Sequence, residues 1–182
     1  HHRMFKQVTI IGLGLIGSSL ARALKKHNLS EKIIVGDISQ QVCQKAMELE
    51  CADAALTDLA VSVKGSDLVI LSVPVGAMAT VGKKIAEHLK EGAIVTDTGS
   101  VKNQVIVQLQ PLLPGHASLV PGHPIAGTEF SGPESGFAEL FEDRWTILTP
   151  QEHTPLKAVE KITRLWEACG SRIEIMDAAH HD

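Results

Sequence analysis

Residues 7–17 read QVTIIGLGLIG, and this stretch decides the fold. The run Val8–Ile11 is continuously apolar, as expected of a β-strand that is covered on both faces. Gly12, Gly14 and Gly17 follow in a Gly-x-Gly-x-x-Gly pattern, and residues 15–28 then have the periodicity of a helix. The sequence therefore predicts a strand, a tight glycine turn and a helix in immediate succession.

The remainder of the chain repeats this alternation of short apolar runs and helical patterns. Further strands are predicted at about 33–35, 68–71, 93–96, 117–120, 145–148 and 172–175, and further helices at about 39–50, 75–90, 101–109 and 155–169. The Pro- and Gly-rich segment Gln110–Pro133 should be mostly loop around the strand at 117–120. We therefore predict an α/β fold with a Rossmann-type, doubly wound and mainly parallel sheet.

The composition narrows the classes of protein that fit. The length of 182 residues, the 44% hydrophobic content and the net charge of -4 predict a globular domain. No apolar run approaches the about 20 residues of a membrane span, and nothing before Met4 resembles a signal peptide, so a cytoplasmic location is expected. His1–Arg3 precede this methionine and are interpreted as a cloning remnant. The mild acidity and the absence of a basic cluster argue against nucleic acid as a partner.

The sequence contains three cysteines, which are Cys43, Cys51 and Cys169. Their spacing is not that of metal ligands, so we expect buried or incidental free thiols and no metal site.

The glycine turn has the context of a dinucleotide-binding motif, because it follows a strand and opens a helix. Gly12 would allow the tight turn, Gly14 would leave the backbone bare beside a pyrophosphate, and Gly17 would let the helix pack closely on the strand. Leu15 and Ile16 stand at the helix N-terminus that would face the phosphates.

Two further segments should complete the cofactor site. Asp37 comes about 20 residues after Gly17, at the end of the next predicted strand, where a carboxylate can accept hydrogen bonds from an adenosine ribose. The same carboxylate would repel a 2′-phosphate, and Ile38–Ser39 supplies no arginine to hold one, so NAD is favoured over NADP. The turn Ser72-Val73-Pro74 follows the strand at 68–71, at the sheet edge where the cofactor should cross.

Two loops should bring chemical groups to the same edge. The loop Asp97–Lys102 follows the strand at 93–96, and Ser100 is a candidate N-cap of the next helix. In the second loop, Pro124 biases His123 toward an extended backbone. When a hydride moves from a carbinol carbon to NAD, the hydroxyl proton must also leave, and a neutral imidazole is its natural acceptor near pH 7. We therefore interpret His123 as a catalytic base, with Ser100 orienting the base or the substrate oxygen.

Three motifs together resemble the prephenate and arogenate dehydrogenases of tyrosine biosynthesis. They are the Gly-x-Gly-x-x-Gly turn, the Asp-x-Gly-Ser-x-Lys loop at 97–102 and the His-Pro-x-Ala-Gly-x-Glu-x-Ser-Gly loop at 123–132. The resemblance implies oxidative decarboxylation of prephenate to 4-hydroxyphenylpyruvate, or of arogenate to tyrosine, with hydride transfer to NAD. It also implies that His123 takes the ring hydroxyl proton, that Ser100 hydrogen-bonds in that relay, and that Thr128 and Glu129 line the substrate side. Lys102 and Arg144 would be structural or electrostatic supports.

The resemblance also implies a division into domains. Residues 4–176 would form the NAD-binding domain, and residues 177–182 would begin a helical C-terminal domain that makes a homodimer and lies beyond this chain. His181–Asp182 are accordingly interpreted as a boundary and not as a metal site. Two alternatives stay open: another Rossmann oxidoreductase that acts on a hydroxy acid or imine, and a non-catalytic NAD-binding domain. The choice between prephenate and arogenate is also open.

Overall fold

The main sheet of the computed structural model is parallel throughout and has the strand order β3-β2-β1-β4-β5-β6. The structure describes residues 3–126 and 132–182. The strands are β1 (Phe5–Ile11), β2 (Ser30–Gly36), β3 (Ala54–Leu56), β4 (Leu68–Leu71), β5 (Ile94–Asp97) and β6 (Ser118–Val120). In this order the chain runs outward from β1 to β3, returns to β4 and continues to the other edge. The predicted doubly wound, Rossmann-type arrangement is confirmed.

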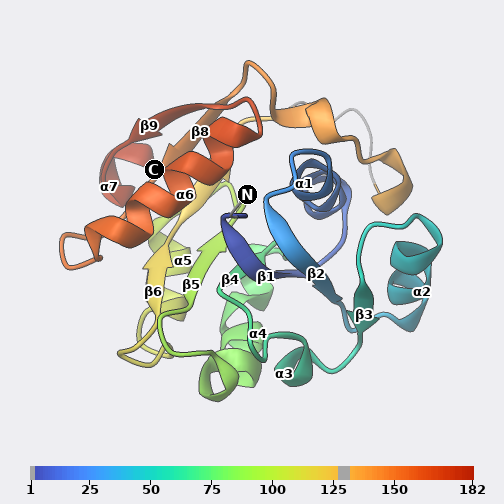
Figure 1. The fold of residues 1–182 in the computed structure, drawn as a ribbon. Coiled ribbons are helices and arrows are strands. Elements are labelled where there is room, and N and C mark those ends of the chain that lie inside the picture. The colour runs from blue at the N-terminus through green and yellow to red at the C-terminus, as the bar shows by residue number, and fades with distance from the viewer. Residues whose placement is uncertain (1–2, 127–131) are drawn as a thin grey trace.

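Helices cover both faces of this sheet (Figure 1). They are α1 (Leu15–Lys26), α2 (Gln40–Glu48), α3 (Leu59–Ser62), α4 (Met78–Ile85), α5 (Asn103–Leu109), α6 (Leu156–Ala168) and α7 (Ala178–His181). Alternate strand residues point to opposite faces, so Ile70 packs in one core with α1 and α6, whereas Val69 and Leu71 pack in another with α3, α4 and α5. Hydrophobic side chains therefore pack on both faces of the sheet.

A second, three-stranded sheet follows the first. It consists of β7 (Gly122–Pro124), β8 (Trp145–Leu148) and β9 (Arg172–Ile175), with β7 antiparallel and β9 parallel to β8. The expectation that Gln110–Pro133 is mostly loop around one strand is wrong at Gly122–Pro124, because this short segment pairs with β8. A three-residue strand beside prolines leaves no periodicity to detect, and its backbone groups are bonded by residues that are distant in the sequence.

The other boundaries differ in detail from the prediction. Short 3-10 turns lie at η1 (Val75–Ala77), η2 (Ala86–His88), η3 (Pro133–Ser135) and η4 (Ala138–Phe141). The helix predicted at about 75–90 is therefore α4 with a 3-10 turn at each end, and the strand β3 and helix α3 were not predicted because each has only three or four residues.

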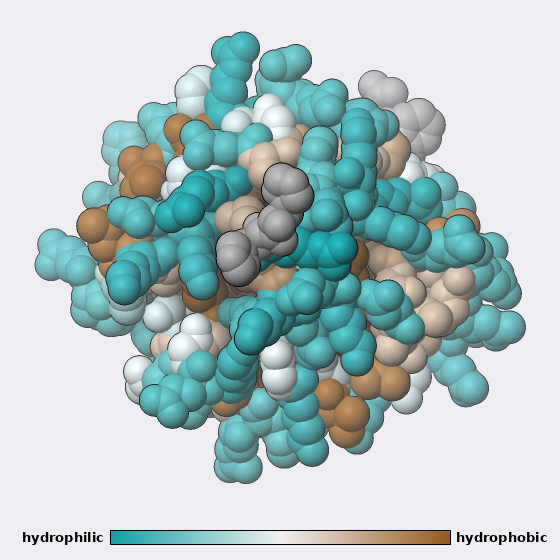
Figure 2. Space-filling model, in the orientation of Figure 1, coloured by the Kyte–Doolittle hydropathy of each residue, from teal (hydrophilic) through white to brown (hydrophobic). Residues whose placement is uncertain are grey.

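The surface shown is mainly polar, and the cysteines lie in the core. The face shown in Figure 2 is largely hydrophilic, with its hydrophobic residues in small separate groups. Within residues 3–126 and 132–182, no helix has both the length and the apolar character that a membrane crossing requires. The three cysteines are buried free thiols, as expected.

Candidate functional site

A cavity of about 410 Å³ lies where β1, β2 and β4 end. It brings together six of the residues that the sequence assigns to a cofactor: Gly12, Gly14, Asp37, Ser72, Val73 and Pro74. Ile38, which is 73% exposed, also lines it. The carboxyl edge of a doubly wound sheet, where the strand order reverses, is the usual place for a nucleotide.

The three glycines of the turn have three different local environments. Gly12 has a φ of +90°, and a Cβ built there would lie 2.4 Å from the carbonyl oxygen of Ser72. A Cβ at Gly17 would lie 2.3 Å from the carbonyl oxygen of Gly12. Around Gly14, by contrast, a Cβ would meet no atom within 4 Å. Gly12 and Gly17 are thus required by the fold itself, whereas Gly14 keeps space open beside the backbone.

The start of helix α1 faces this open space. Its N-cap is Gly14, which has no side chain to bond the first-turn N–H groups. Leu15 is buried in the core and Ile16 packs against it, so these two residues offer backbone rather than side-chain groups to a ligand. Uncapped N–H groups and the positive end of the helix dipole suit a phosphate.

Asp37 is held in a defined orientation directly after β2. One carboxylate oxygen, Oδ2, accepts a hydrogen bond from the backbone N–H of Leu13 at 3.2 Å, and Oδ1 accepts one from that of Ser39 at 2.9 Å. The first bond ties the carboxylate to the glycine turn. Asp37 therefore lies on the same cavity wall as Gly12 and Gly14.

The loop after β5 contacts this cavity from the neighbouring strand. The Thr98 hydroxyl donates a hydrogen bond to Oγ of Ser72 at 3.1 Å, and the Thr98 N–H donates to the carbonyl of Leu71 at 3.2 Å. Because Ser72 lines the cavity, residues 97–102 and the cofactor turn meet at one edge.

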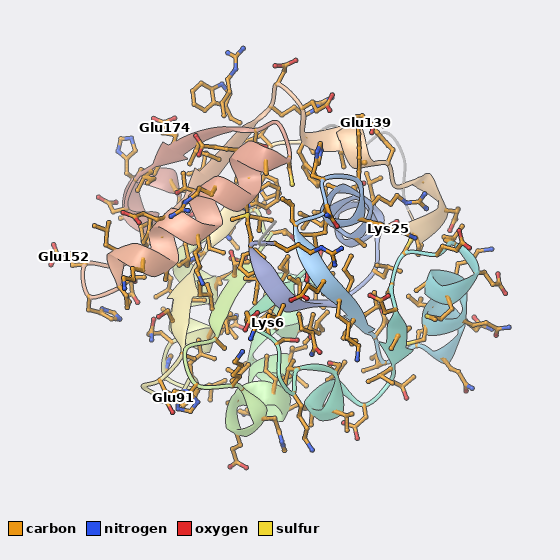
Figure 3. The ribbon with its side chains drawn as sticks, viewed as in Figure 1. Lys6, Lys25, Glu91, Glu139, Glu152 and Glu174 are labelled. Carbon is orange, nitrogen blue, oxygen red and sulfur yellow. The ribbon has the colours of Figure 1, made fainter. Side chains whose placement is uncertain are left out.

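A buried ion pair joins this loop to strand β7. Lys102 Nζ donates to Oδ2 of Asp97 and to the carbonyl of Gly122, each at 2.6 Å. The other carboxylate oxygen of Asp97 accepts the Gly122 N–H at 3.1 Å. Charged side chains such as Glu152 and Glu174 extend from the surface (Figure 3), whereas both members of this pair are fully buried.

Burial and attraction act in opposite directions on this pair. Burial raises the pKa of the Asp97 carboxyl and lowers the pKa of the Lys102 ammonium, while their mutual attraction opposes both changes. The lysine side chain bonds a carboxylate and a backbone carbonyl, and it does not line the cavity.

His123 lies on strand β7 and not in a loop, which corrects the sequence-based expectation. It pairs with Ile147 of β8, and its neighbour Gly122 is held by the buried ion pair. Burial lowers the pKa of the His123 imidazole, as do the neighbouring His181 and Lys102, whereas Asp182 raises it. The backbone of His123 is therefore fixed by a β-ladder, and the lowered pKa favours the neutral imidazole.

Ser100 is not the N-cap of the following helix. Helix α5 begins at Asn103 with Lys102 as N-cap, and Ser100 is exposed two residues earlier. The reason is a distant partner: the Asp182 carboxylate accepts the N–H groups of Lys102 and Asn103, each at 3.0 Å. These orphan donors are therefore satisfied without a hydroxyl from the loop.

Sequence reasoning missed His181 and Asp182 as members of the site. Nε2 of His181 lies 2.9 Å from Nδ1 of His123, and Nδ1 of His181 lies 2.6 Å from Oδ1 of Asp182. The two imidazole rings meet edge to face with their centroids 5.1 Å apart. A contact between residues 58 positions apart has no local sequence signal.

The remaining predicted residues are Arg144, Thr128 and Glu129. Arg144 is exposed on the turn that precedes β8. Thr128 and Glu129 lie outside the described residues, which are 3–126 and 132–182. In those same ranges, no group of three His, Cys, Asp or Glu residues has the arrangement of a metal site.

Comparison with known proteins agrees with these features. Residues 20–175 match the family described as prephenate dehydrogenase, nucleotide-binding domain. The chain is 49% identical to a cyclohexadienyl dehydrogenase of Zymomonas mobilis, over 98% of this chain and 61% of the relative.

Two solved structures have the same fold over nearly the whole chain. The prephenate dehydrogenase of Aquifex aeolicus, in complex with hydroxyphenyl propionate and NAD+, is 36% identical with a TM-score of 0.89, over 97% of this chain and 61% of that one. The arogenate dehydrogenase of Synechocystis is 31% identical with a TM-score of 0.88, over 96% of this chain and 61% of that one. The chain thus spans about 61% of the length of these relatives. The family model covers most of the chain, so the chain belongs to the prephenate dehydrogenase family and corresponds to its nucleotide-binding domain.

Proposed function

We propose that this chain binds NAD and provides the catalytic base of a dehydrogenase that oxidatively decarboxylates prephenate or arogenate. The observation that carries the proposal is the placement of His123. A β-ladder holds the backbone of His123, and a buried ion pair ties the preceding residue, Gly122, to the loop that contacts Ser72 in the candidate cofactor cavity. Family membership supports the same reaction class.

The cavity fits NAD in three respects. The space beside Gly14 and the uncapped start of α1 suit a pyrophosphate, with Leu15, Ile16 and Gly17 in the first turn. The Asp37 carboxylate can accept ribose hydroxyl hydrogen bonds and would repel a 2′-phosphate, so NAD is preferred over NADP. The cavity is also lined by Ser72, Val73 and Pro74. When bound, NAD supplies the acceptor for a hydride.

In the proposed reaction, His123 accepts one proton from the substrate. As the hydride leaves the ring carbon that carries the hydroxyl, the neutral imidazole accepts the hydroxyl proton. The bond to the ring carboxylate breaks, carbon dioxide departs, and the electron pair from that bond completes the aromatic ring. The oxygen is left as a phenolate, which takes the proton back from the imidazolium. The lowered pKa of His123 keeps the accepting form abundant. We assign Ser100 to hydrogen bonding in this relay, and Thr128 and Glu129 to the substrate side, on the family motif alone.

The decisive measurement is NADH formation from NAD and prephenate, or NAD and arogenate, followed by ultraviolet absorbance. It should be made with this chain and with a version extended beyond residue 182, because the relatives are longer. We expect turnover in the extended protein and a loss of about 10²–10⁴-fold in His123→Asn, with NAD affinity unchanged. The exposed His153→Asn is the matched control.

Two results would contradict the proposal. If neither substrate were converted while NAD bound tightly, the non-catalytic NAD-binding domain would be the better assignment. If His123→Asn kept nearly full activity, another Rossmann oxidoreductase chemistry would be favoured. The homodimer that the family resemblance implies stays a prediction, which sedimentation of the extended protein would test.

A further inference from the structure

Three side chains form a continuous line that ends at the proposed base. Oδ1 of Asp182 lies 2.6 Å from Nδ1 of His181, and Nε2 of His181 lies 2.9 Å from Nδ1 of His123. The His181 side chain is 7% exposed, so water has little access to the middle of the line. His181 therefore uses both of its ring nitrogens within the line, whereas His123 uses only Nδ1.

Asp182 is fixed at the outer end of this line. Its Oδ1 accepts the Lys102 N–H and its Oδ2 accepts the Asn103 N–H, each at 3.0 Å, at the start of α5. The Asn103 N–H, the bond with His181 and the Lys102 N–H lower the pKa of the Asp182 carboxyl to about 2. The carboxylate is thus anionic at neutral pH, and it can only accept hydrogen bonds.

An acceptor at one end determines the position of every proton along the line. Nδ1 of His181 must carry a hydrogen to bond Asp182, which leaves Nε2 of a neutral His181 as an acceptor. Nδ1 of His123 must then carry the hydrogen that bonds His181. A neutral His123 with its hydrogen on Nδ1 has its lone pair on Nε2.

We propose that His181 and Asp182 are positioning residues that hold neutral His123 in the Nδ1–H tautomer, so that Nε2 is the atom that accepts the substrate proton. The Nδ1–H tautomer of His123 is inferred from the three hydrogen-bonded side chains alone. That Nε2 accepts a substrate proton rests on the function proposed above. Neither residue needs to touch the substrate.

The charges around His123 favour the same arrangement. The positive charge of Lys102 and the neighbouring His181 both disfavour a positive charge on the His123 imidazole, whereas Asp182 supplies a nearby negative charge. Lys102 is itself paired with Asp97. If His181 were protonated, its Nε2–H would donate to Nδ1 of His123 and move the His123 hydrogen to Nε2, which blocks the base.

The tautomer can be measured on this chain without any turnover. Two-bond and three-bond ¹H–¹⁵N correlations distinguish a protonated from an unprotonated imidazole nitrogen, and the His123→Asn spectrum identifies the His123 signals. At a pH where the ring is neutral, we expect a protonated Nδ1 and an unprotonated Nε2 in the wild-type protein. A protonated Nε2 would overturn the proposal.

Variants of His181 separate positioning from packing. His181→Phe retains a ring without an acceptor, so the single Nδ1–H tautomer should be lost. His181→Gln places an amide oxygen near the position of Nε2 and should restore it at least in part. The same change at the exposed neighbour, His180→Gln, is the control and should leave the tautomer unchanged. Retention of the wild-type tautomer in His181→Phe would contradict the proposal. If a variant failed to fold, the wild-type spectrum alone would decide.

Turnover in the extended protein separates this inference from the proposed function. We expect kcat to fall by about 10- to 100-fold in His181→Phe and to recover in His181→Gln. The loss is smaller than the about 10²–10⁴-fold that a positioned base contributes, because His123 itself is still present. The Nδ1–H tautomer without turnover of either substrate would refute the function and leave the positioning intact. NADH formation with an Nε2–H tautomer in the wild type would refute the positioning alone.

Discussion

Nζ of Lys102 lies 2.6 Å from Oδ2 of Asp97, and neither side chain is exposed to solvent. Two buried charges pay a desolvation cost that their attraction often fails to recover, so the pair is not explained by stability alone. Both partners also bond Gly122, the residue before His123. The ion pair therefore connects the carboxyl end of β5 in the main sheet to β7, the strand that carries the proposed base.

Removing one partner should be strongly destabilising. In Lys102→Met the Asp97 carboxylate is left buried without its cation, and the free energy of unfolding should fall by about 3–5 kcal/mol. Urea denaturation measures the change. The control is Lys45→Met, because Lys45 pairs with Glu48 on the surface at 3.7 Å and should contribute about 0.2–1 kcal/mol.

Replacing both partners should not restore stability in this protein. An isolated buried ion pair can often be exchanged for apolar residues at little cost. Here Asp97→Leu combined with Lys102→Met would also leave the N–H groups of Gly99 and Gly122 and the carbonyl of Gly122 without partners. Since each unsatisfied buried group costs about 1–3 kcal/mol, the double variant should be no more stable than Lys102→Met. A double variant as stable as the wild type would contradict this account.

Alanine substitutions should separate the folding role of the glycine turn from its binding role. Gly17→Ala places a Cβ 2.3 Å from the carbonyl oxygen of Gly12, so it should destabilise the protein by about 1–3 kcal/mol. Gly14→Ala meets open space and should change stability by no more than about 0.5 kcal/mol, yet weaken NAD binding because its methyl group occupies the phosphate side. Thermal unfolding and titration calorimetry measure the two effects. Equal destabilisation by both variants would refute the distinction.

The sheet and its glycine turn could be predicted from sequence because their signals are local. Val8–Ile11, the glycines and the following helix are consecutive, and Asp37 follows at a spacing that one helix and one strand determine. Apolar runs in strands that are buried on both faces are equally visible without knowledge of their partners.

The surroundings of His123 could not be predicted because their causes are distant in the chain. Its strand exists through pairing with β8, and His181 reaches it from 58 residues away. Asp182 bonds the backbone of Lys102 across 80 residues, which is why Ser100 does not cap α5 although local capping rules favour it. Neither contact follows a periodicity, and a motif identifies such residues without explaining their contacts.

The preference for NAD can be tested at Asp37. Replacing the carboxylate in Asp37→Ser removes a charged acceptor of ribose hydrogen bonds and the repulsion of a 2′-phosphate. A hydrogen bond to a charged group contributes about 1.5–3 kcal/mol, so NAD affinity should fall by about 10- to 100-fold while NADP affinity rises. Calorimetric titration with both nucleotides measures the gap, with the exposed Glu31→Ser as control. An unchanged ratio of the two affinities would exclude this role for Asp37.

The pH dependence of turnover should report the depressed pKa of His123. The base must be neutral to accept a proton, and burial together with His181 and Lys102 lowers the pKa of this imidazole below 6.5. A lower pKa keeps the neutral form populated at lower pH, so the acid limb of kcat/KM for the extended protein should have its midpoint below pH 6.5. The limb should disappear with the activity in His123→Asn and persist in His153→Asn. A midpoint at or above 6.5 would mean that Asp182 outweighs burial at this ring.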